Sequence, residues 1–324
     1  MLVLTRADLE RVLEPAAVIA AVEAAFREAA AGRAPALPRA SLPTARDGMF
    51  LGMISALPRL NALGAKLISF VGSNRKRGLP THQATYLLSD LETGAPLAFM
   101  EAGFLTAIRT GAASAVAAKY LARADSRQIA CFGAGVQAEF QLRCLKGVLP
   151  LESVVVVGRD PIRTWAFAER MRGALGLPVE VTRNRRAAVR DADVVTCATT
   201  STRPVFAGGD LRAGTHVDAV GSFRPATREV DTETVRRARV VVDTYQGAWA
   251  GAGDLLIPIK ARAVSRRHIR AELAEVVARK KPGRTRSGEI TLFKSVGWAP
   301  EDAATARLAY DRAMAQGIGT EVTL

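Results

Sequence analysis

The most informative spacing in the sequence joins Gly133, Gly135 and Ala138 in the order G-x-G-x-x-A. An apolar run at 128–132 precedes the motif, as in a buried strand, and a helical pattern follows it. At such a turn the first glycine permits a tight bend, the second lets a pyrophosphate approach the backbone, and the small third residue allows close packing. The N–H groups at the start of the helix then face the phosphates. We therefore expect a dinucleotide to bind at this turn, at Gly133, Gly135, Val136, Gln137 and Ala138.

The choice between NAD and NADP depends on the residues after the second strand, which read Val157-Gly158-Arg159-Asp160-Pro161. A carboxylate at this point usually binds the ribose 2′-hydroxyl of NAD, whereas an arginine often accommodates the 2′-phosphate of NADP. Asp160 is better explained as a helix N-cap, with Pro161 at the first helical position. Arg159 then meets the ribose, which favours NADP(H), although an arginine can also stack on adenine in either cofactor.

The composition is close to the average for globular proteins, with 49 % hydrophobic and 23 % charged residues among 324. This hydrophobicity excludes disorder as the dominant state, and the length predicts two domains or one large one. The net charge of +14 is compatible with an anionic ligand, a nucleic acid or an arginine-rich surface alone. Because aromatic residues make up only 6 % and no recognition motif occurs, we expect no nucleic-acid partner.

Cysteines and chain patterning bear on compartment and metal content. The three cysteines form no C-x-x-C pair, so we expect neither a disulfide framework nor a zinc site, and we predict a cytoplasmic, reducing location. The three histidines show no ligand spacing, and no metal is expected. Neither a signal peptide nor a run of about 18 apolar residues that would span a membrane is recognised.

The secondary-structure pattern changes near residue 127. Before it, we expect helices at 14–31 and 102–122 around mainly antiparallel strands. After it, strands alternate with helices, which predicts a doubly wound parallel sheet. The predicted class is α/β: an α+β domain at 1–115, to which a C-terminal helix at 303–324 returns, and a Rossmann-type domain at 116–302.

With these motifs in place, the chain resembles the ornithine cyclodeaminase/μ-crystallin family. The matching segments follow one another along nearly the whole chain, at 64–70, 78–82, 90–97, 105–114, 133–138, 198–201, 219–222, 251–255 and 288–297. The resemblance implies a homodimer formed through the N-terminal domain, NAD(P) bound by the Rossmann domain, and a small imino or amino acid as substrate.

The resemblance also implies that Arg39, Lys66 and Arg109 bind the substrate carboxylate. The chemistry of these residues agrees, because cations fix a small carboxylate and an arginine can do so with two parallel hydrogen bonds. Lys66 lies within an apolar run, where an unpaired lysine is costly to bury. Further cofactor contacts are implied at Thr110, Thr199, Ser201 and Val220.

One position departs from the cyclodeaminases of this family. These carry G-G-D-x-P-G-K-T-E, and their aspartate is assigned to the deamination, whereas residues 221–229 here read GSFRPATRE. Phe223 therefore occupies the aspartate position, and a phenyl ring can neither act as a base nor bind an ammonium group by charge. The G-S-F-x-P form resembles the branch with μ-crystallin and Δ1-pyrroline-2-carboxylate reductases.

The preferred hypothesis is an NAD(P)H-dependent reductase of a small cyclic ketimine acid, such as Δ1-pyrroline-2-carboxylate. The alternatives are an ornithine cyclodeaminase with bound NAD, an alanine-type amino acid dehydrogenase, and a non-catalytic protein that binds NADP(H) and a small ligand. The retention of Lys66 and Arg109 argues against binding alone.

Overall fold

The computed structural model describes residues 1–44 and 48–323, which divide into two compact units. Unit 1 consists of residues 1–109 and 299–324, and unit 2 of residues 110–298. The sequence had placed the boundaries after residues 115 and 302. The second boundary lies earlier because the last long helix, α11 (Ala299–Gln316), begins four residues before the helix predicted from Ala303. Glu301 and Asp302 therefore belong to unit 1.

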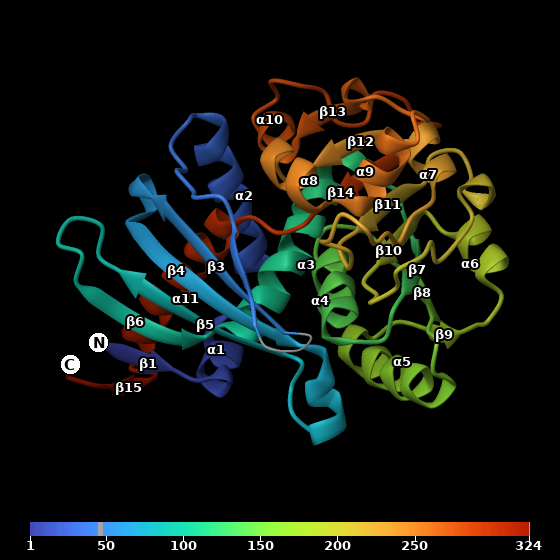
Figure 1. Ribbon diagram of the computed structural model, residues 1–324. Helices are drawn as coiled ribbons and strands as arrows, with labels where there is room; N and C mark the ends of the chain where they lie inside the picture. The colour runs from blue at the N-terminus through green and yellow to red at the C-terminus, as the bar shows by residue number, and fades with distance from the viewer. Residues whose placement is uncertain (45–47, 324) are drawn as a thin grey trace. The chain divides into compact units, whose positions relative to one another are not determined.

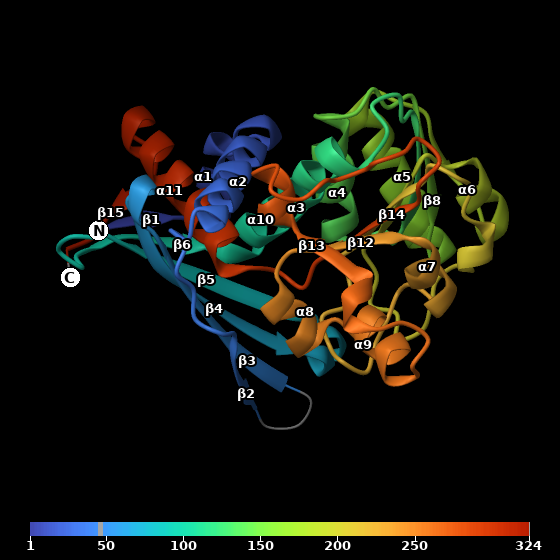
Figure 2. The same ribbon diagram turned by 90° about the horizontal axis from the view of Figure 1, so that it is seen from above.

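Unit 1 is a seven-stranded sheet with helices on one face (Figures 1 and 2). The strand order is β15-β1-β6-β5-β4-β3-β2, and every pairing is antiparallel except that of β1 with β6. The strands are β1 (Leu2–Leu4), β2 (Ala40–Pro43), β3 (Gly48–Leu57), β4 (Ala62–Val71), β5 (His82–Ser89), β6 (Pro96–Glu101) and β15 (Thr320–Glu321). The helices are α1 (Arg6–Val12), α2 (Pro15–Ala30) and α11. Helix α11 packs against α2 and against strands β3, β4 and β5.

The register of this sheet places four buried residues in one row across its helix-covered face. Met53 pairs with Lys66, Lys66 with Tyr86, and Tyr86 with Met100. Because neighbouring residues along a strand point to opposite faces, the residues directly before and after each of these four point away from the helices. A lysine and a tyrosine thus lie beside each other between two methionines, beneath α11.

Unit 2 is an eight-stranded, wholly parallel sheet in the order β13-β12-β14-β11-β10-β7-β8-β9. Its strands are β7 (Gln128–Phe132), β8 (Ser153–Val157), β9 (Val179–Val181), β10 (Val194–Cys197), β11 (His216–Ala219), β12 (Arg239–Val242), β13 (Ile269–Glu272) and β14 (Thr291–Lys294). Across the sheet, strands β9, β8, β7, β10, β11 and β14 lie in the 3-2-1-4-5-6 order that is typical of dinucleotide-binding sheets. The predicted doubly wound fold is therefore confirmed, while strands β13 and β14 were not anticipated.

The helices of unit 2 follow the strands, as the alternating pattern predicted (Figure 1). They are α3 (Ala102–Leu121), which begins in unit 1, α4 (Val136–Lys146), α5 (Pro161–Leu175), α6 (Arg185–Asp191), α7 (Thr232–Arg237), α8 (Tyr245–Gly251), α9 (Gly253–Lys260) and α10 (Leu273–Val277). Asp160 accepts a hydrogen bond from the Arg163 N–H and caps α5, with Pro161 at the first position, as predicted. Among the described residues, no helix is both long and apolar enough to cross a membrane.

Candidate functional site

A buried cluster of opposite charges lies beneath α11 in unit 1. Lys66 Nζ is 2.5 Å from Oδ1 of Asp302, and Arg109 Nε donates to the same oxygen over 2.8 Å. The second arm of Arg109 donates to Glu301 Oε2, also over 2.8 Å. All four side chains are at most 5 % exposed. Two of the three predicted substrate-binding cations are thus brought together, and both are paired with carboxylates that the sequence had not suggested.

Burial and neighbouring cations tune this cluster. Burial, reinforced by the charge of Arg109 and opposed by Asp302, lowers the pKa of Lys66 to about 7. Arg39, the third predicted cation, also lowers this pKa, so it lies within electrostatic reach of Lys66. The pKa of Arg109 shifts the other way: burial opposes its charge, but Asp302 and Glu301 outweigh burial and raise it. Lys66 can therefore exchange a proton near neutral pH, whereas Arg109 remains a fixed cation.

Tyr86 is a functional candidate that the sequence analysis missed. Its ring is 1 % exposed, and its Oη has no hydrogen-bond partner among the residues the structure describes. Burial and the charge of Asp302 both raise its pKa well above the ordinary value, so the phenol keeps its proton. A buried donor without an acceptor is costly. The cross-strand register places this unpartnered phenol next to Lys66, which the sequence alone does not reveal.

The predicted dinucleotide turn has the expected backbone geometry. Gly133 adopts φ +123°, and a Cβ there would lie 2.4 Å from the carbonyl oxygen of Ala198, so only glycine fits. At Gly135 a Cβ would meet nothing within 4 Å, which leaves open space against the backbone. Gly135 is also the N-cap of α4 and provides no side-chain acceptor for the first turn. The open N–H groups of this turn fit a pyrophosphate.

Of the other residues at this turn, some are buried in the packing of the helix and others offer an exposed side chain or a polar atom. Ala138 is buried, and Val136 is 53 % exposed at the helix start. The Gln137 Oε1 atom is buried without a hydrogen-bond partner in the described part of the chain. Thr110, on α3, accepts a hydrogen bond at its carbonyl from Gln141 of α4. The turn therefore has both an open backbone and an unused amide oxygen.

Glu229 joins two loops that follow neighbouring strands. Its Oε1 accepts from the N–H of Thr199 at 2.6 Å and from the Thr199 hydroxyl at 2.7 Å. Its Oε2 accepts from the N–H groups of Gly221 and Ser222 at 2.6 and 3.2 Å. These loops leave the carboxyl ends of β10 and β11, where parallel sheets bind ligands. The predicted cofactor residues Thr199, Ser201 and Val220 lie in these two loops.

A second carboxylate, Asp254, binds the backbone at Glu229 and forms an ion pair with Lys294. The Asp254 Oδ1 atom accepts from the N–H groups of Glu229 and Val230, and its Oδ2 is 2.9 Å from Lys294 Nζ. Lys294 also donates to the carbonyls of Ala219 and Ser222. Burial raises the pKa of Glu229, and the charge of Lys294 opposes that rise. In the sequence, Glu229, Asp254 and Lys294 stood out only as parts of the segments that resemble the family. Their contact with one another could not be predicted, because it forms only when the sheet has folded.

Phe223 and Asp218 lie where their chemistry is limited. The Phe223 ring packs against the core of unit 2, beneath the Arg224 guanidinium at 5.7 Å. Asp218 is fully buried within β11 and contacts His216 Nε2 at 3.2 Å. Glu229, although close to Gly221, uses both carboxylate oxygens on backbone N–H groups. Asp218 is therefore held inside the strand and Glu229 by the backbone, and neither replaces the aspartate that Phe223 displaces. Arg159, by contrast, is exposed immediately after β8.

Comparisons with known proteins agree with this geometry. Residues 1–317 match the model of the ornithine cyclodeaminase/mu-crystallin family. A Δ1-pyrroline-2-carboxylate reductase of Bacillus cereus is 37 % identical over 324 residues, which cover 99 % of each chain. The structure of Thermococcus litoralis Δ1-pyrroline-2-carboxylate reductase, in complex with NADH and L-proline, superposes with a TM-score of 0.97 at 45 % identity, covering 99 % of this chain and 100 % of that one.

A second solved structure broadens the range of reactions among the relatives. An archaeal alanine dehydrogenase dimer with bound NAD superposes with a TM-score of 0.94 at 33 % identity, covering 100 % of this chain and 99 % of that one. The whole-chain match to the family model and the relatives that share its full length agree with the dinucleotide turn and the buried cations. The chain belongs to the ornithine cyclodeaminase/mu-crystallin family.

Proposed function

We propose that this protein is an NAD(P)H-dependent reductase that converts Δ1-pyrroline-2-carboxylate, or a close cyclic ketimine acid, to the corresponding cyclic amino acid, proline or a homologue. The observation that carries the proposal is the buried charge cluster of unit 1. With Lys66 protonated, Lys66 and Arg109 share one oxygen of Asp302, and the phenol of Tyr86, paired with Lys66 across the sheet, has no acceptor among the described residues. A substrate carboxylate bound at this point would accept hydrogen bonds from these groups. The likeness to a reductase bound to NADH and L-proline supports the same substrate class.

The chemistry requires a hydride at C2 of the C=N bond and a proton at nitrogen. The reduced nicotinamide cofactor, when bound, supplies the hydride. The residues of the chain bind the carboxylate, keep the imine nitrogen protonated and exclude water. Lys66 is the group suited to hold that proton, because its pKa of about 7 lets it give up a proton and regain it near neutral pH. Tyr86 is suited to donate a hydrogen bond to the same ligand.

The residue at position 223 argues against ornithine cyclisation. Ornithine carries a second ammonium group, which needs an anionic partner in the pocket. Phe223 replaces the family's aspartate, and Glu229 is committed to the backbone of two loops. We therefore rank ketimine reduction above deamination. Alanine-type dehydrogenase activity is the second candidate, because a relative with that name and bound NAD shares the whole fold.

We further propose that the protein is a cytoplasmic homodimer. The face of the unit 1 sheet that points away from the helices exposes six apolar side chains, which are spread over strands β2 to β6. These are Leu42, Phe50, Ile54, Leu67, Leu87 and Phe99. A monomer rarely exposes so large an apolar surface, and a second copy of the same face would cover it. The dimer of the archaeal alanine dehydrogenase supports this assembly, and the three buried free cysteines suit a reducing compartment.

The test is NADH and NADPH oxidation with purified protein and a panel of substrates. The panel contains five- and six-membered cyclic imino acids, pyruvate with ammonia, and ornithine with NAD⁺. We expect the highest kcat/KM with a cyclic imino acid. Lys66→Met should abolish that activity, whereas Lys260→Met, which removes an exposed lysine on α9, should leave it unchanged. A higher kcat/KM with pyruvate and ammonia would establish the second candidate instead.

A further inference from the structure

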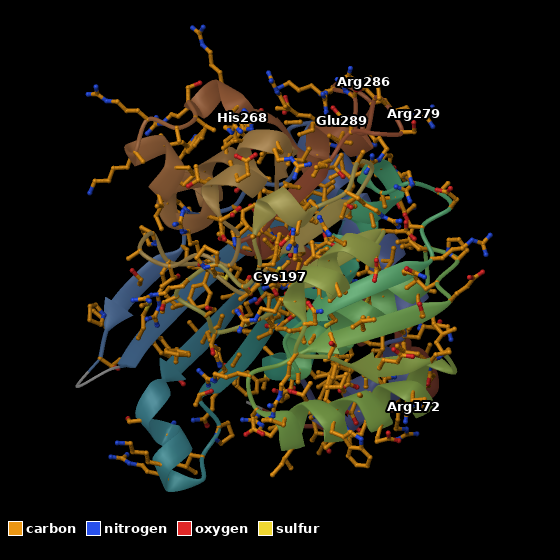
Figure 3. All side chains as sticks on the ribbon, turned by 90° about the vertical axis from the view of Figure 1, so that its right-hand side faces the viewer. Arg172, Cys197, His268, Arg279, Arg286 and Glu289 are labelled. Carbon is orange, nitrogen blue, oxygen red and sulfur yellow. The ribbon has the colours of Figure 1, made fainter. Side chains whose placement is uncertain are left out.

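The edge of the unit 2 sheet where the strands begin carries a cavity that the proposed reaction does not use. Its volume is about 680 Å³, and it is lined by residues at or just before the starts of β11, β12, β13 and β14. The dinucleotide turn follows the carboxyl end of β7. Because all strands are parallel, the cavity and that turn lie at opposite edges of the sheet. In Figure 3, three lining residues, His268, Arg286 and Glu289, lie at the top, apart from Cys197 at the carboxyl end of β10.

The cavity is strongly basic. Five arginines line it, at positions 236, 237, 239, 270 and 286, with His268 and a single acid, Glu289. Arg236 pairs with Glu233, and Arg239 is 3.6 Å from Glu289. Five arginines against these two carboxylates leave three positive charges. Neither Arg270 nor Arg286 takes part in an ion pair within the described chain.

One donor in the cavity lining has no acceptor. Arg239 Nε is buried without a hydrogen-bond partner in the part of the chain that the structure describes. The same side chain gives one terminal nitrogen to the Pro282 carbonyl and lies 3.6 Å from Glu289 through the other. A buried guanidinium N–H without a partner is costly, and an anion in the cavity would satisfy it. The surplus charge and this unpartnered donor point to the same class of ligand.

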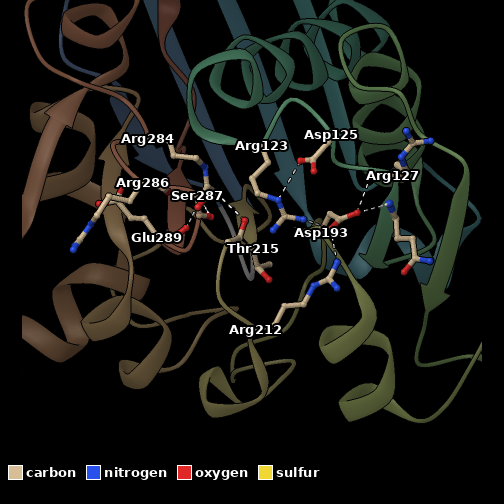
Figure 4. A network of polar contacts seen from close by, with 12 residues as sticks. Arg123, Asp125, Arg127, Asp193, Arg212, Thr215, Arg284, Arg286, Ser287 and Glu289 are labelled. Carbon is tan, nitrogen blue, oxygen red and sulfur yellow. Dashed lines mark hydrogen bonds and ion pairs between the residues drawn. The ribbon is translucent and has the colours of Figure 1, made fainter.

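The loop that carries Arg286 is held in place before any ligand binds. Arg284 Nε donates to the carbonyl of Leu121 at 2.7 Å, and its Nη2 donates to both the Gly214 carbonyl and Thr291 Oγ1. Its Nη1 donates to the carbonyls of Ser287 and Glu289 within the loop (Figure 4). Burial, with the nearby charge of Arg123, lowers the pKa of Arg284 to about 10. Glu289 accepts from the N–H and the hydroxyl of Thr285 and closes the loop. A preformed loop reduces the entropic cost of binding.

We propose that this cavity binds a small anion with two or three linked phosphate groups, such as a di- or triphosphate. Arginine guanidinium groups match phosphate oxygens with paired hydrogen bonds, and each phosphate carries between one and two charges near neutral pH. The volume lies within the range of small-molecule sites. Among the described residues that line the cavity there is no phenylalanine, tyrosine or tryptophan, so it lacks the large aromatic platforms on which the bases of single-stranded nucleic acid stack.

The test is isothermal titration with pyrophosphate, ATP and adenosine, at constant ionic strength and with saturating NADH. Saturating NADH blocks the dinucleotide turn, which could also bind phosphates. We expect one site for pyrophosphate and for ATP, and none for adenosine. Arg270→Ser combined with Arg286→Ser should weaken both at least tenfold, because both arginines are exposed and neither supports the core. The control, Arg11→Ser with Arg59→Ser, removes the same charge from unit 1 and should bind as the wild type does.

Three results would overturn the proposal. The first is failure of millimolar pyrophosphate and ATP to bind the wild type. The second is equal binding by the paired Arg270 and Arg286 variant, once circular dichroism and NADH binding show that it is folded. The third is much tighter binding of a duplex oligonucleotide through the same two arginines. None of these results depends on which imine the protein reduces.

Discussion

Lys66 on β4 and Asp302 on α11 form a buried ion pair with 2.5 Å between Nζ and Oδ1, although 236 positions separate them in the chain. Asp302 Oδ1 also accepts from Arg109 Nε, so one carboxylate oxygen is shared by two cations. Its other oxygen has no hydrogen-bond partner among the described residues. This sharing holds both cations at one place, where a substrate carboxylate could bind them together.

Removing the lysine should destabilise the fold as well as the activity. Lys66→Met leaves the buried Asp302 with one cation instead of two, and breaking a buried pair costs about 3–5 kcal/mol. Because burial opposes the charge of Lys66 and offsets much of the attraction to Asp302, we expect the unfolding free energy in urea to fall by less than this, by about 1 kcal/mol. Adding Asp302→Asn should recover at least half of that loss without restoring activity. An Lys66→Met protein of wild-type stability would show that the pair contributes little.

The protonation state of Lys66 predicts the pH dependence of the reaction. Its pKa of about 7 means that the ammonium form disappears as pH rises above neutrality. If this form supplies the proton, kcat/KM for imine reduction should fall about tenfold per pH unit above 7. Lys66→Arg keeps the charge but cannot release the proton, so its residual activity should lack this decline. An unchanged profile in that variant would assign the proton to another group.

The lowered pKa of Lys66 also affects the stability of the fold, which should rise with pH where the activity falls. The folded pKa of about 7 lies below the ordinary value of 10.5, so between them the unfolded chain binds the proton more tightly. The free energy of unfolding should therefore rise with pH across that interval. Urea titrations at pH 7.5 and pH 9 would measure it, and Lys66→Met should lose this contribution. A fall in stability that depends on Lys66 would contradict the lowered pKa.

Arg159 should distinguish the two cofactors. The residue is exposed directly after β8, and the carboxylate beside it, Asp160, is used as the cap of α5. A charge-assisted bond to the 2′-phosphate would favour NADPH by about 10–100-fold. Arg159→Ala should then raise the KM for NADPH far more than that for NADH, while Arg170→Ala, farther along α5, should change neither. Equal changes for both cofactors would show that Arg159 stacks on adenine.

Glu229 should act as a positioning residue for the cofactor loops. In Glu229→Gln one oxygen becomes an amide NH₂, which faces backbone N–H groups and cannot accept from them. We expect the KM for the reduced cofactor to rise at least tenfold, with a smaller change in the KM for the imine. Glu233→Gln, on the exposed surface of α7, is the matched control. Equal increases in both KM values would indicate a general loss of fold.

Ornithine provides the test of the residue at position 223. Wild-type protein with ornithine and NAD⁺ should release no ammonia, because Phe223 provides no charge and the nearby Glu229 is bound to backbone N–H groups. Ammonia release, measured in parallel with imine reduction, is the readout. A rate of ornithine-dependent ammonia release above that of imine reduction would reverse the order of the two functions.

The sequence by itself determined the parts of this protein that depend on local patterns. The glycine spacing at Gly133 and Gly135 requires no distant contact, since a tight turn and an open backbone follow from the absence of a side chain. The alternation of strands and helices after residue 127 likewise specified a parallel sheet. The Asp160-Pro161 pair correctly marked the start of α5, because capping is a local hydrogen bond.

Only the tertiary structure decided which charges meet. The lysine in an apolar run was recognisable, but its partner lies on α11, whose first turn the pattern from Ala303 left out. The phenol of Tyr86 and the joining of two loops by Glu229 depend on strand register and on neighbouring strands. The five arginines of the basic cavity come from three separate segments of the sequence and converge because parallel strands all begin at one edge. Such pairings connect positions far apart in the chain, and no spacing along a sequence encodes them directly.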